Sequence, residues 1–171
     1  IDTTGKGDYM KYNAFMLVVS DMEKSRAFYE KLLGLKVAMD LGVNVSYDCG
    51  VALQTKETWL EFIDKPENAV CFGGNDKELY FEEDDLDGFL KVLESWGAAL
   101  VRPMFTQAWG QRVIRFYDPD HHIIEVGEPL SLVIKRFLSQ GLSIEATAER
   151  TMCPLPYVQF LAKELAEEIN E

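Results

Sequence analysis

Cysteine, histidine and long apolar runs are scarce in this chain of 171 residues. The three cysteines, Cys49, Cys71 and Cys153, show neither Cys-X-X-Cys spacing nor a neighbouring histidine, which argues against a disulfide framework or a zinc site. No apolar run approaches the roughly 20 residues that a membrane-spanning helix needs. The chain also begins without a charged-then-apolar signal pattern. We therefore expect a cytoplasmic protein without a membrane partner.

Basic residues are also few, because 17 Lys and Arg stand against 29 Asp and Glu and give a net charge of −12. Nucleic-acid binding needs a basic face, so we expect no nucleic-acid partner. The acidity has two interpretations that the sequence leaves open. It keeps the protein in solution, or it favours cationic ligands.

A hydrophobic fraction of 47% is enough to build a core, and the apolar residues follow one pattern twice. Each copy reads as an apolar strand, an Asp, a helical stretch ending at Gly, and a new strand. The intervals from Asp21 to Gly34 and from Asp84 to Gly97 are both 13 residues long. Asp before a helix and Gly after it are typical helix caps. The repeat predicts one supersecondary unit used twice, with function sought between the two copies.

The rest of the chain completes these two units and adds a tail. The first copy is expected to have strands at 11–20, 36–39, 43–48 and 51–63. The second is expected to have a strand at 78–82, a helix at 86–96 and strands at 99–103, 111–117 and 123–126.

The predicted divisions of the chain are a first βαβββ module at 10–64, a linker at 65–76, a second module at 77–128 and a helical tail at 129–171. Residues 1–9 are interpreted as a remnant ahead of the native start. The tail is expected to contain helices at 130–138, 144–150 and 156–169 that cover a sheet edge or a dimer partner, so we expect a homodimer.

Two segments carry a family resemblance, VVSDMEKSRAFYEKLLGLKV at 18–37 and WGQRVIRFYDPDHHIIEVGE at 109–128. They resemble the vicinal oxygen chelate superfamily, which includes glyoxalase I, the extradiol dioxygenases and the bleomycin-resistance proteins. The resemblance implies an α+β fold in which two βαβββ modules form a U-shaped mixed-sheet barrel, here with a C-terminal helical extension. Because one fold hosts unrelated functions, the resemblance does not by itself fix the reaction.

Metal-dependent members of that superfamily place ligands on the first and fourth strand of each module. The resemblance carries these positions onto Ala14, Gln54, Glu78 and Glu125. This set lacks the imidazoles that suit Zn, Ni and Fe, so no metal is favoured. If a divalent metal such as Mg, Mn, Ni or Zn binds, its expected ligands are Gln54, Glu78 and Glu125. Without a metal, Glu78 and Glu125 are candidates for a catalytic acid and base, because two close carboxylates push their pKa values apart.

Other side chains are candidates for binding a small molecule in the cleft between the modules. Arg112 would anchor a carboxylate or phosphate, and its alternative is an ion pair with Glu78 or Glu125. The remaining candidate ligand-binding residues are Gln54, Tyr47, Tyr80, Trp109 and Phe116, whose alternative is ordinary core or rim packing. His121 and His122 follow Asp-Pro-Asp and are interpreted as turn residues.

Three functions follow from these observations. The first is a glyoxalase-like or bleomycin-resistance-like protein that binds a small molecule without a catalytic metal. The second is a metal-dependent lyase or isomerase of the glyoxalase I type, or a related dioxygenase. The third is a non-enzymatic interaction protein that acts through its helical tail.

Overall fold

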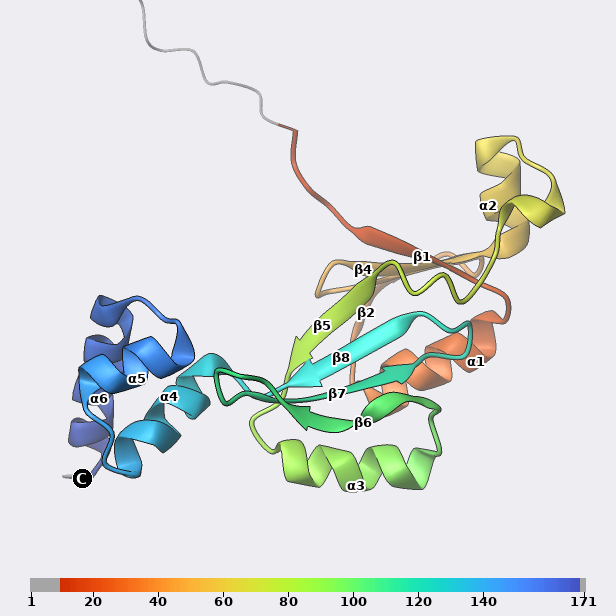
Figure 1. Ribbon diagram of the computed structural model, residues 1–171. Helices are drawn as coiled ribbons and strands as arrows, with labels where there is room; N and C mark the ends of the chain where they lie inside the picture. The colour runs from red at the N-terminus through yellow and green to blue at the C-terminus, as the bar shows by residue number, and fades with distance from the viewer. Residues whose placement is uncertain (1–9, 170–171) are drawn as a thin grey trace, which may run out of the picture. The chain divides into compact units, whose positions relative to one another are not determined.

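The computed structural model describes residues 10–169, without the side chain of Ile169. The interpretation of residues 1–9 as a remnant falls outside this range. The chain divides into two compact units between Cys71 and Phe72, a point within the segment 65–76. Each unit has its own four-stranded mixed sheet, drawn in Figure 1.

The first unit builds its sheet from strands on both sides of a helical segment. Its elements are β1 (Phe15–Val19), α1 (Met22–Arg26), η1 (Ala27–Leu32), β2 (Val37–Asp40), β3 (Asn44–Tyr47), β4 (Val51–Thr55), α2 (Lys56–Ile63) and η2 (Glu67–Ala69). The strand order is β1-β4-β3-β2, with β1 parallel to β4 and the other pairs antiparallel. Asp21 starts α1, because its Oδ1 accepts a hydrogen bond from the Lys24 amide at 3.0 Å. The expected helix is confirmed, and its second half, η1, is a π-helix.

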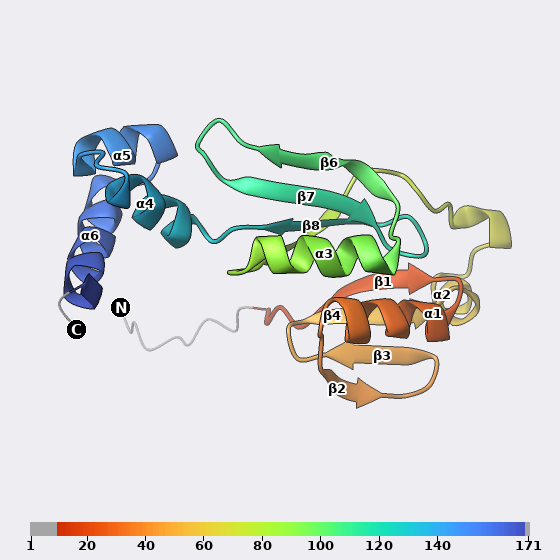
Figure 2. The same ribbon diagram turned by 90° about the horizontal axis from the view of Figure 1, so that it is seen from below.

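One face of this first sheet packs on α1 and η1, which Figure 2 shows beside the strands. Leu17 and Val19 of β1 are buried, and as residues two apart on a strand they point to the same face of the sheet. The aromatic rings of Phe28 and Tyr29 are also buried, and they meet edge to face at 5.2 Å. The core of the first unit therefore lies between β1–β4 and the α1–η1 segment.

The prediction of one strand over 51–63 is wrong beyond Thr55. Strand β4 ends there, and α2 follows directly. Trp59, Leu60 and Ile63 stand at helical spacing, and Asp64 ends the helix with a left-handed φ of 50°. A short apolar run fits either a strand or a helix, and here the helical period is the correct one.

The second unit repeats the topology of the first. Its sheet contains β5 (Glu78–Glu82), β6 (Leu100–Thr106), β7 (Arg112–Tyr117) and β8 (Ile123–Gly127) in the order β5-β8-β7-β6, with β5 parallel to β8. Helix α3 (Leu86–Trp96) covers one face, where Phe89 meets Phe116 at 5.9 Å between ring centroids. The α+β class and the two βαβββ modules are thus confirmed, each with an open sheet.

One cap in the second unit differs from the prediction. The N-cap of α3 is Asp85 and not Asp84, because Asp85 Oδ1 accepts a hydrogen bond from the Gly88 amide at 2.9 Å. Gly97 ends the helix with a φ of 77°, as expected for a C-cap. The left-handed glycine therefore lies 13 residues after the N-cap in the first copy, from Asp21 to Gly34, and 12 residues after it in the second, from Asp85 to Gly97.

The tail forms three helices, α4 (Leu130–Ser139), α5 (Ile144–Thr151) and α6 (Leu155–Ile169). All three match the predicted ranges within one residue. Ser143 begins α5 by accepting a hydrogen bond from the Ala146 amide at 3.1 Å. The helices share a small apolar core around Ile134, Val158 and Leu161. Among the helices described for residues 10–169, none is long and apolar enough to cross a membrane.

Candidate functional site

The two faces of strand β7 carry different chemistry, because successive side chains of a strand point to opposite faces. Arg112, Ile114 and Phe116 share the face that α3 covers, whereas Val113, Arg115 and Tyr117 share the other. On that other face Arg115 lies directly opposite Glu125 of β8, and Tyr80 of β5 lies opposite Glu125 on its other side. We call the side chains of Glu78, Tyr80, Arg115, Tyr117 and Glu125 the open face of the second unit.

Arg115 joins the two carboxylates of the open face. Its Nε donates a hydrogen bond to Glu78 Oε2 at 3.0 Å, and its guanidinium forms an ion pair with Glu125 Oε2. The Glu125 side chain is 8% exposed, whereas that of Glu78 is 40% exposed. Glu78 and Glu125 therefore share one cation. Arg115 was not among the residues expected from the sequence. It lies directly across from Glu125, on the same face of the sheet.

Tyr80 belongs to a second hydrogen-bond chain along the open face. Its hydroxyl donates to Glu82 Oε1 at 3.1 Å and accepts from Gln111 Nε2 at 2.9 Å. Trp109 Nε1 donates to Gln111 Oε1 at 3.0 Å. Partial burial, followed by the hydrogen bond to Glu82, raises the pKa of Tyr80 above its ordinary value. Gln111 thus links Tyr80 with Trp109, two of the candidate ligand-binding residues.

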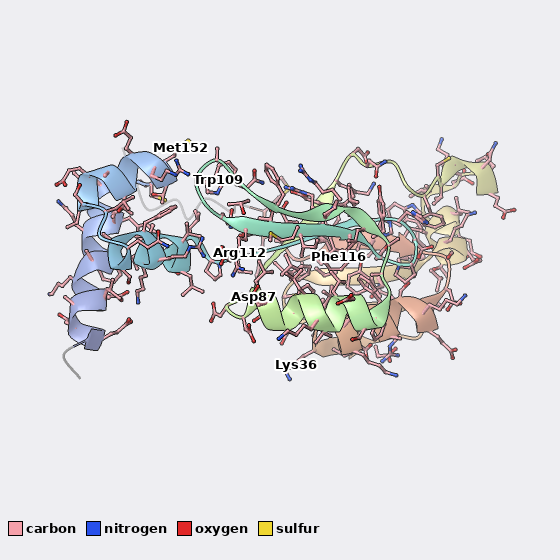
Figure 3. All side chains as sticks on the ribbon, turned by 60° about the horizontal axis from the view of Figure 1, so that its bottom comes forward. Lys36, Asp87, Trp109, Arg112, Phe116 and Met152 are labelled. Atoms are coloured by element: carbon pink, nitrogen blue, oxygen red, sulfur yellow. The ribbon has the colours of Figure 1, made fainter. Side chains whose placement is uncertain are left out.

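Arg112 lies away from the open face. Its Nε donates to Glu128 Oε1 at 2.9 Å, and its other nitrogens contact Glu128 and Asp87. The expected alternative, an ion pair with Glu78 or Glu125, is therefore wrong, because Arg115 takes that role. Figure 3 shows Arg112 near Asp87, with Phe116 farther along the sheet above α3. Phe116 is fully buried in the core that the sheet forms with this helix.

The first unit places its two candidates on opposite faces of its sheet. Tyr47 is buried beside Tyr29, with ring centroids 6.2 Å apart, so it belongs to the helix-covered core. Gln54 lies on the other face and is also buried. Its Oε1 accepts a hydrogen bond from Asn44 Nδ2 at 2.9 Å, and its Nε2 donates to Thr58 Oγ1. Both ends of the Gln54 amide are therefore engaged within the first unit.

These contacts decide how well the residues fit a metal ion. Within residues 10–169, no three His, Cys, Asp or Glu side chains are grouped so as to hold one. Ala14 offers no donor atom, and the amide of Gln54 is neutral and already paired. The carboxylates of Glu78 and Glu125 face a guanidinium. The donor set described for this chain does not fit a metal centre of the superfamily type.

Both histidines lie in the turn between β7 and β8. His121 has a left-handed φ of 63°, and its amide donates to the Asp118 carbonyl at 3.0 Å. His122 Nδ1 lies 2.8 Å from Asp118 Oδ2, and both side chains are buried. The interpretation of the two histidines as turn residues is confirmed.

Comparison with known proteins places the chain in a family. The model of the Glyoxalase-like domain matches residues 12–131. A crystal structure of a protein of unknown function from Agrobacterium tumefaciens is 35% identical, covers 71% of this chain and 95% of its own, and superposes with a TM-score of 0.63. The uncharacterized protein YraH from Bacillus subtilis is 28% identical over 124 residues, which are 68% of this chain and 97% of YraH.

A more distant structure shows the fold alone. Lactoylglutathione lyase from Agrobacterium tumefaciens is 21% identical, covers 69% of this chain and 92% of its own, and has a TM-score of 0.54. The family match ends at residue 131, so most of the helical tail lies beyond it. With its two βαβββ units and its match over residues 12–131, the chain belongs to the Glyoxalase-like domain family, within the vicinal oxygen chelate superfamily.

Proposed function

We propose that this protein binds a small organic molecule on the open face of its second unit and does so without a catalytic metal. The observation that carries the proposal is the position of Arg115. Its guanidinium pairs with Glu78 and Glu125, the two residues at which the superfamily resemblance expects metal ligands in this unit.

A metal ion at these carboxylates would have to displace a cation that the sheet itself supplies. Strand register holds Arg115 opposite Glu125, so the pairing is built into the β7–β8 ladder. A metal ion that displaced the Arg115 guanidinium would leave this cation without its carboxylate partners. The cost of the unpaired charge opposes metal binding. In the first unit, the hydrogen bonds to Asn44 and Thr58 likewise occupy Gln54.

The chemistry of the open face indicates the class of ligand. Tyr80 is 46% exposed and offers a ring for stacking and a hydroxyl for hydrogen bonding. Three carboxylates, those of Glu78, Glu82 and Glu125, stand against two guanidinium groups, those of Arg102 and Arg115, on the same side of the sheet. The surplus is negative, and the whole chain is acidic as well. A cationic, partly aromatic molecule matches this face, as in drug-binding proteins of the bleomycin-resistance type.

The first test is a calorimetric titration of the intact protein with bleomycin, a cationic glycopeptide, in buffer containing EDTA, followed by a panel of cationic drugs. We expect saturable binding that weakens about tenfold in Glu78→Gln, because one charge-assisted contact is lost. The matched control is Glu61→Gln, which removes an exposed carboxylate from α2 and should leave binding unchanged. Absence of saturable binding across the panel would contradict the proposal.

A second test addresses the metal. Melting temperatures would be compared in EDTA and with added Mn²⁺, Ni²⁺, Zn²⁺ or Mg²⁺, because an ion that binds only the folded state raises the melting temperature. We expect no stoichiometric shift. A shift that disappears in Glu125→Ala would refute the metal-free mechanism and favour the lyase.

A further inference from the structure

A hollow in the second unit lies between the β6–β7 hairpin and the helical tail, and none of its lining residues belongs to the open face. Figures 1 and 2 both show this hairpin beside α4. The hollow has a volume of about 530 Å³ and is lined by Thr106, Gly110, Arg112, Arg136, Phe137 and Arg150. We call it the arginine hollow. Its volume lies within the usual range for small-molecule sites.

The charge of the arginine hollow is opposite to that of the molecule. The chain carries six arginines in all, and three of them line this one hollow. The net charge of the chain is −12, so acidic groups dominate elsewhere. Bringing three like charges together is unfavourable unless carboxylates or a bound anion compensate them.

The carboxylates of the second unit compensate only part of this charge. Arg112 and Arg136 both donate to Glu128 Oε1, at 2.9 Å and 2.7 Å, and Arg112 also reaches Asp87. Arg150 has no carboxylate within 4.0 Å among the described side chains, and its guanidinium lies 5.9 Å from the ring centroid of Phe137. Two carboxylates therefore face three guanidinium groups.

The arrangement is held in place by close packing at Gly110. A Cβ at this position would come within 2.6 Å of Phe137 Cε2, so the missing side chain lets the ring of α4 lie against the hairpin. The Gly110 carbonyl accepts a hydrogen bond from Arg136 at 2.7 Å. The hairpin and α4 thus fix the positions of Arg112 and Arg136, whereas Arg150 of α5 is exposed and free to meet a ligand.

We propose that the arginine hollow binds a small organic anion through its carboxylate or phosphate oxygens. Guanidinium groups present planar pairs of N–H donors that match both kinds of oxyanion. Arg112 and Arg136 retain N–H donors beyond those given to Glu128, and Arg150 supplies the charge that no protein carboxylate neutralises. Arg136, Phe137 and Arg150 lie beyond the residues matched by the family, so the tail supplies half of the lining of this site.

The experiment titrates the full-length protein with inorganic phosphate and with malonate at low, constant ionic strength, using calorimetry and thermal melting. Sodium chloride at equal ionic strength corrects for screening. We expect one saturable site, with affinity reduced about tenfold or more in Arg150→Gln, because a charge-assisted contact is lost. Tighter binding of phosphate would indicate a phosphorylated ligand, and tighter binding of malonate a carboxylated one.

The matched control is Lys91→Gln. Lys91 is an exposed cation on α3 that does not line the hollow and is not part of the open face. Its loss should leave anion binding unchanged. The proposal is overturned if neither anion shows saturable binding, or if Arg150→Gln binds as tightly as the parent protein.

Discussion

Glu128 connects the second sheet with the tail, because its carboxylate binds an arginine from each of them. Its carboxylate accepts hydrogen bonds from the Arg112 amide at 3.0 Å, from the Arg112 guanidinium and from the Arg136 guanidinium. Burial alone would raise the pKa of Glu128. The hydrogen bonds from Arg136 and Arg112 outweigh this effect and lower the pKa to about 2.

This pKa predicts a pH dependence of stability. A carboxyl group whose pKa is lower in the folded state stabilises the protein above its unfolded pKa, and this contribution is lost as the pH falls from about 5 to about 2. For Glu128 the contribution is up to about 3 kcal/mol. We expect Glu128→Gln to lose stability at pH 7 and to show a flatter pH profile in that window, measured by urea unfolding at several pH values.

The control for Glu128→Gln is Glu94→Gln, an exposed carboxylate on α3. It should follow the parent protein at every pH. If Glu128→Gln also ran parallel to the parent from pH 7 to pH 3, the ion pairs around Glu128 would not stabilise the fold.

Single residues also show what the sequence can and cannot predict. Alternation along a strand puts Arg112 and Phe116, four residues apart, on one face of β7. It could not indicate which face meets α3, because β7 carries apolar residues on both faces, such as Val113 and Ile114. Arg115 was overlooked for this reason, although Glu125 was identified through the family resemblance. Partners across a sheet depend on register, which a single sequence does not give.

At the scale of elements, the β6–β7 hairpin is positioned by a glycine that has two separate constraints. Gly110 has a left-handed φ of 90°, and its missing side chain makes room for Phe137 of α4. Any other residue at position 110 would therefore meet both conformational strain and steric overlap.

A pair of glycine substitutions separates these two effects. Gly97 has a φ of 77°, but no atom lies within 4 Å of the place where an added methyl group would stand, so Gly97→Ala should cost only about 1 kcal/mol of conformational strain. We expect Gly110→Ala to cost about 1–3 kcal/mol more, because Phe137 must move. Denaturant unfolding of both variants measures the difference.

Equal costs for the two glycine variants would contradict the tight contact at Gly110. The double variant Gly110→Ala with Phe137→Leu provides a further check. A smaller side chain at 137 should recover part of the stability if the overlap with the ring is the cause.

Elements with strong end signals were predicted well. Helix α3 and strand β5 have the bounds that the sequence predicts, and α5 begins after Ser143 as its capping pattern indicates. Helix α2 was missed, because Thr55 gives no side-chain cap and the run Trp59–Ile63 fits a strand as well as a helix. Capping residues at the ends of elements therefore predicted their bounds better than the pattern of apolar residues did.

At the scale of the whole molecule, the tail exposes apolar side chains that its own core does not use. Tyr157 and Phe160 on α6 are 41% and 56% exposed, whereas Val158 and Leu161 on the same helix are buried. An exposed apolar stripe beside a buried one is typical of an association surface. The expected homodimer stays a prediction, and this stripe is where we expect the tail to contribute.

Sedimentation equilibrium would test the homodimer. We expect the parent protein to be dimeric at micromolar concentration and the double variant Tyr157→Glu with Phe160→Glu to shift toward monomer, because two charges enter an apolar contact. Lys163→Glu changes the charge of the same helix at an exposed position and should leave the dimer intact. A monomeric parent protein, or an unchanged double variant, would contradict the prediction.

The route of the chain from sheet to tail has a practical consequence for anyone who shortens this protein. Strand β8 lies between β5 and β7, and the next residue, Glu128, still bonds to the sheet through its amide and its carbonyl, at 3.1 Å and 2.7 Å. Pro129 is the N-cap of α4, which begins at Leu130. A chain cut before Glu128 would remove bonds from the middle of the sheet, whereas a chain cut after Pro129 would keep them. A cut that detaches the tail should therefore fall after Glu128.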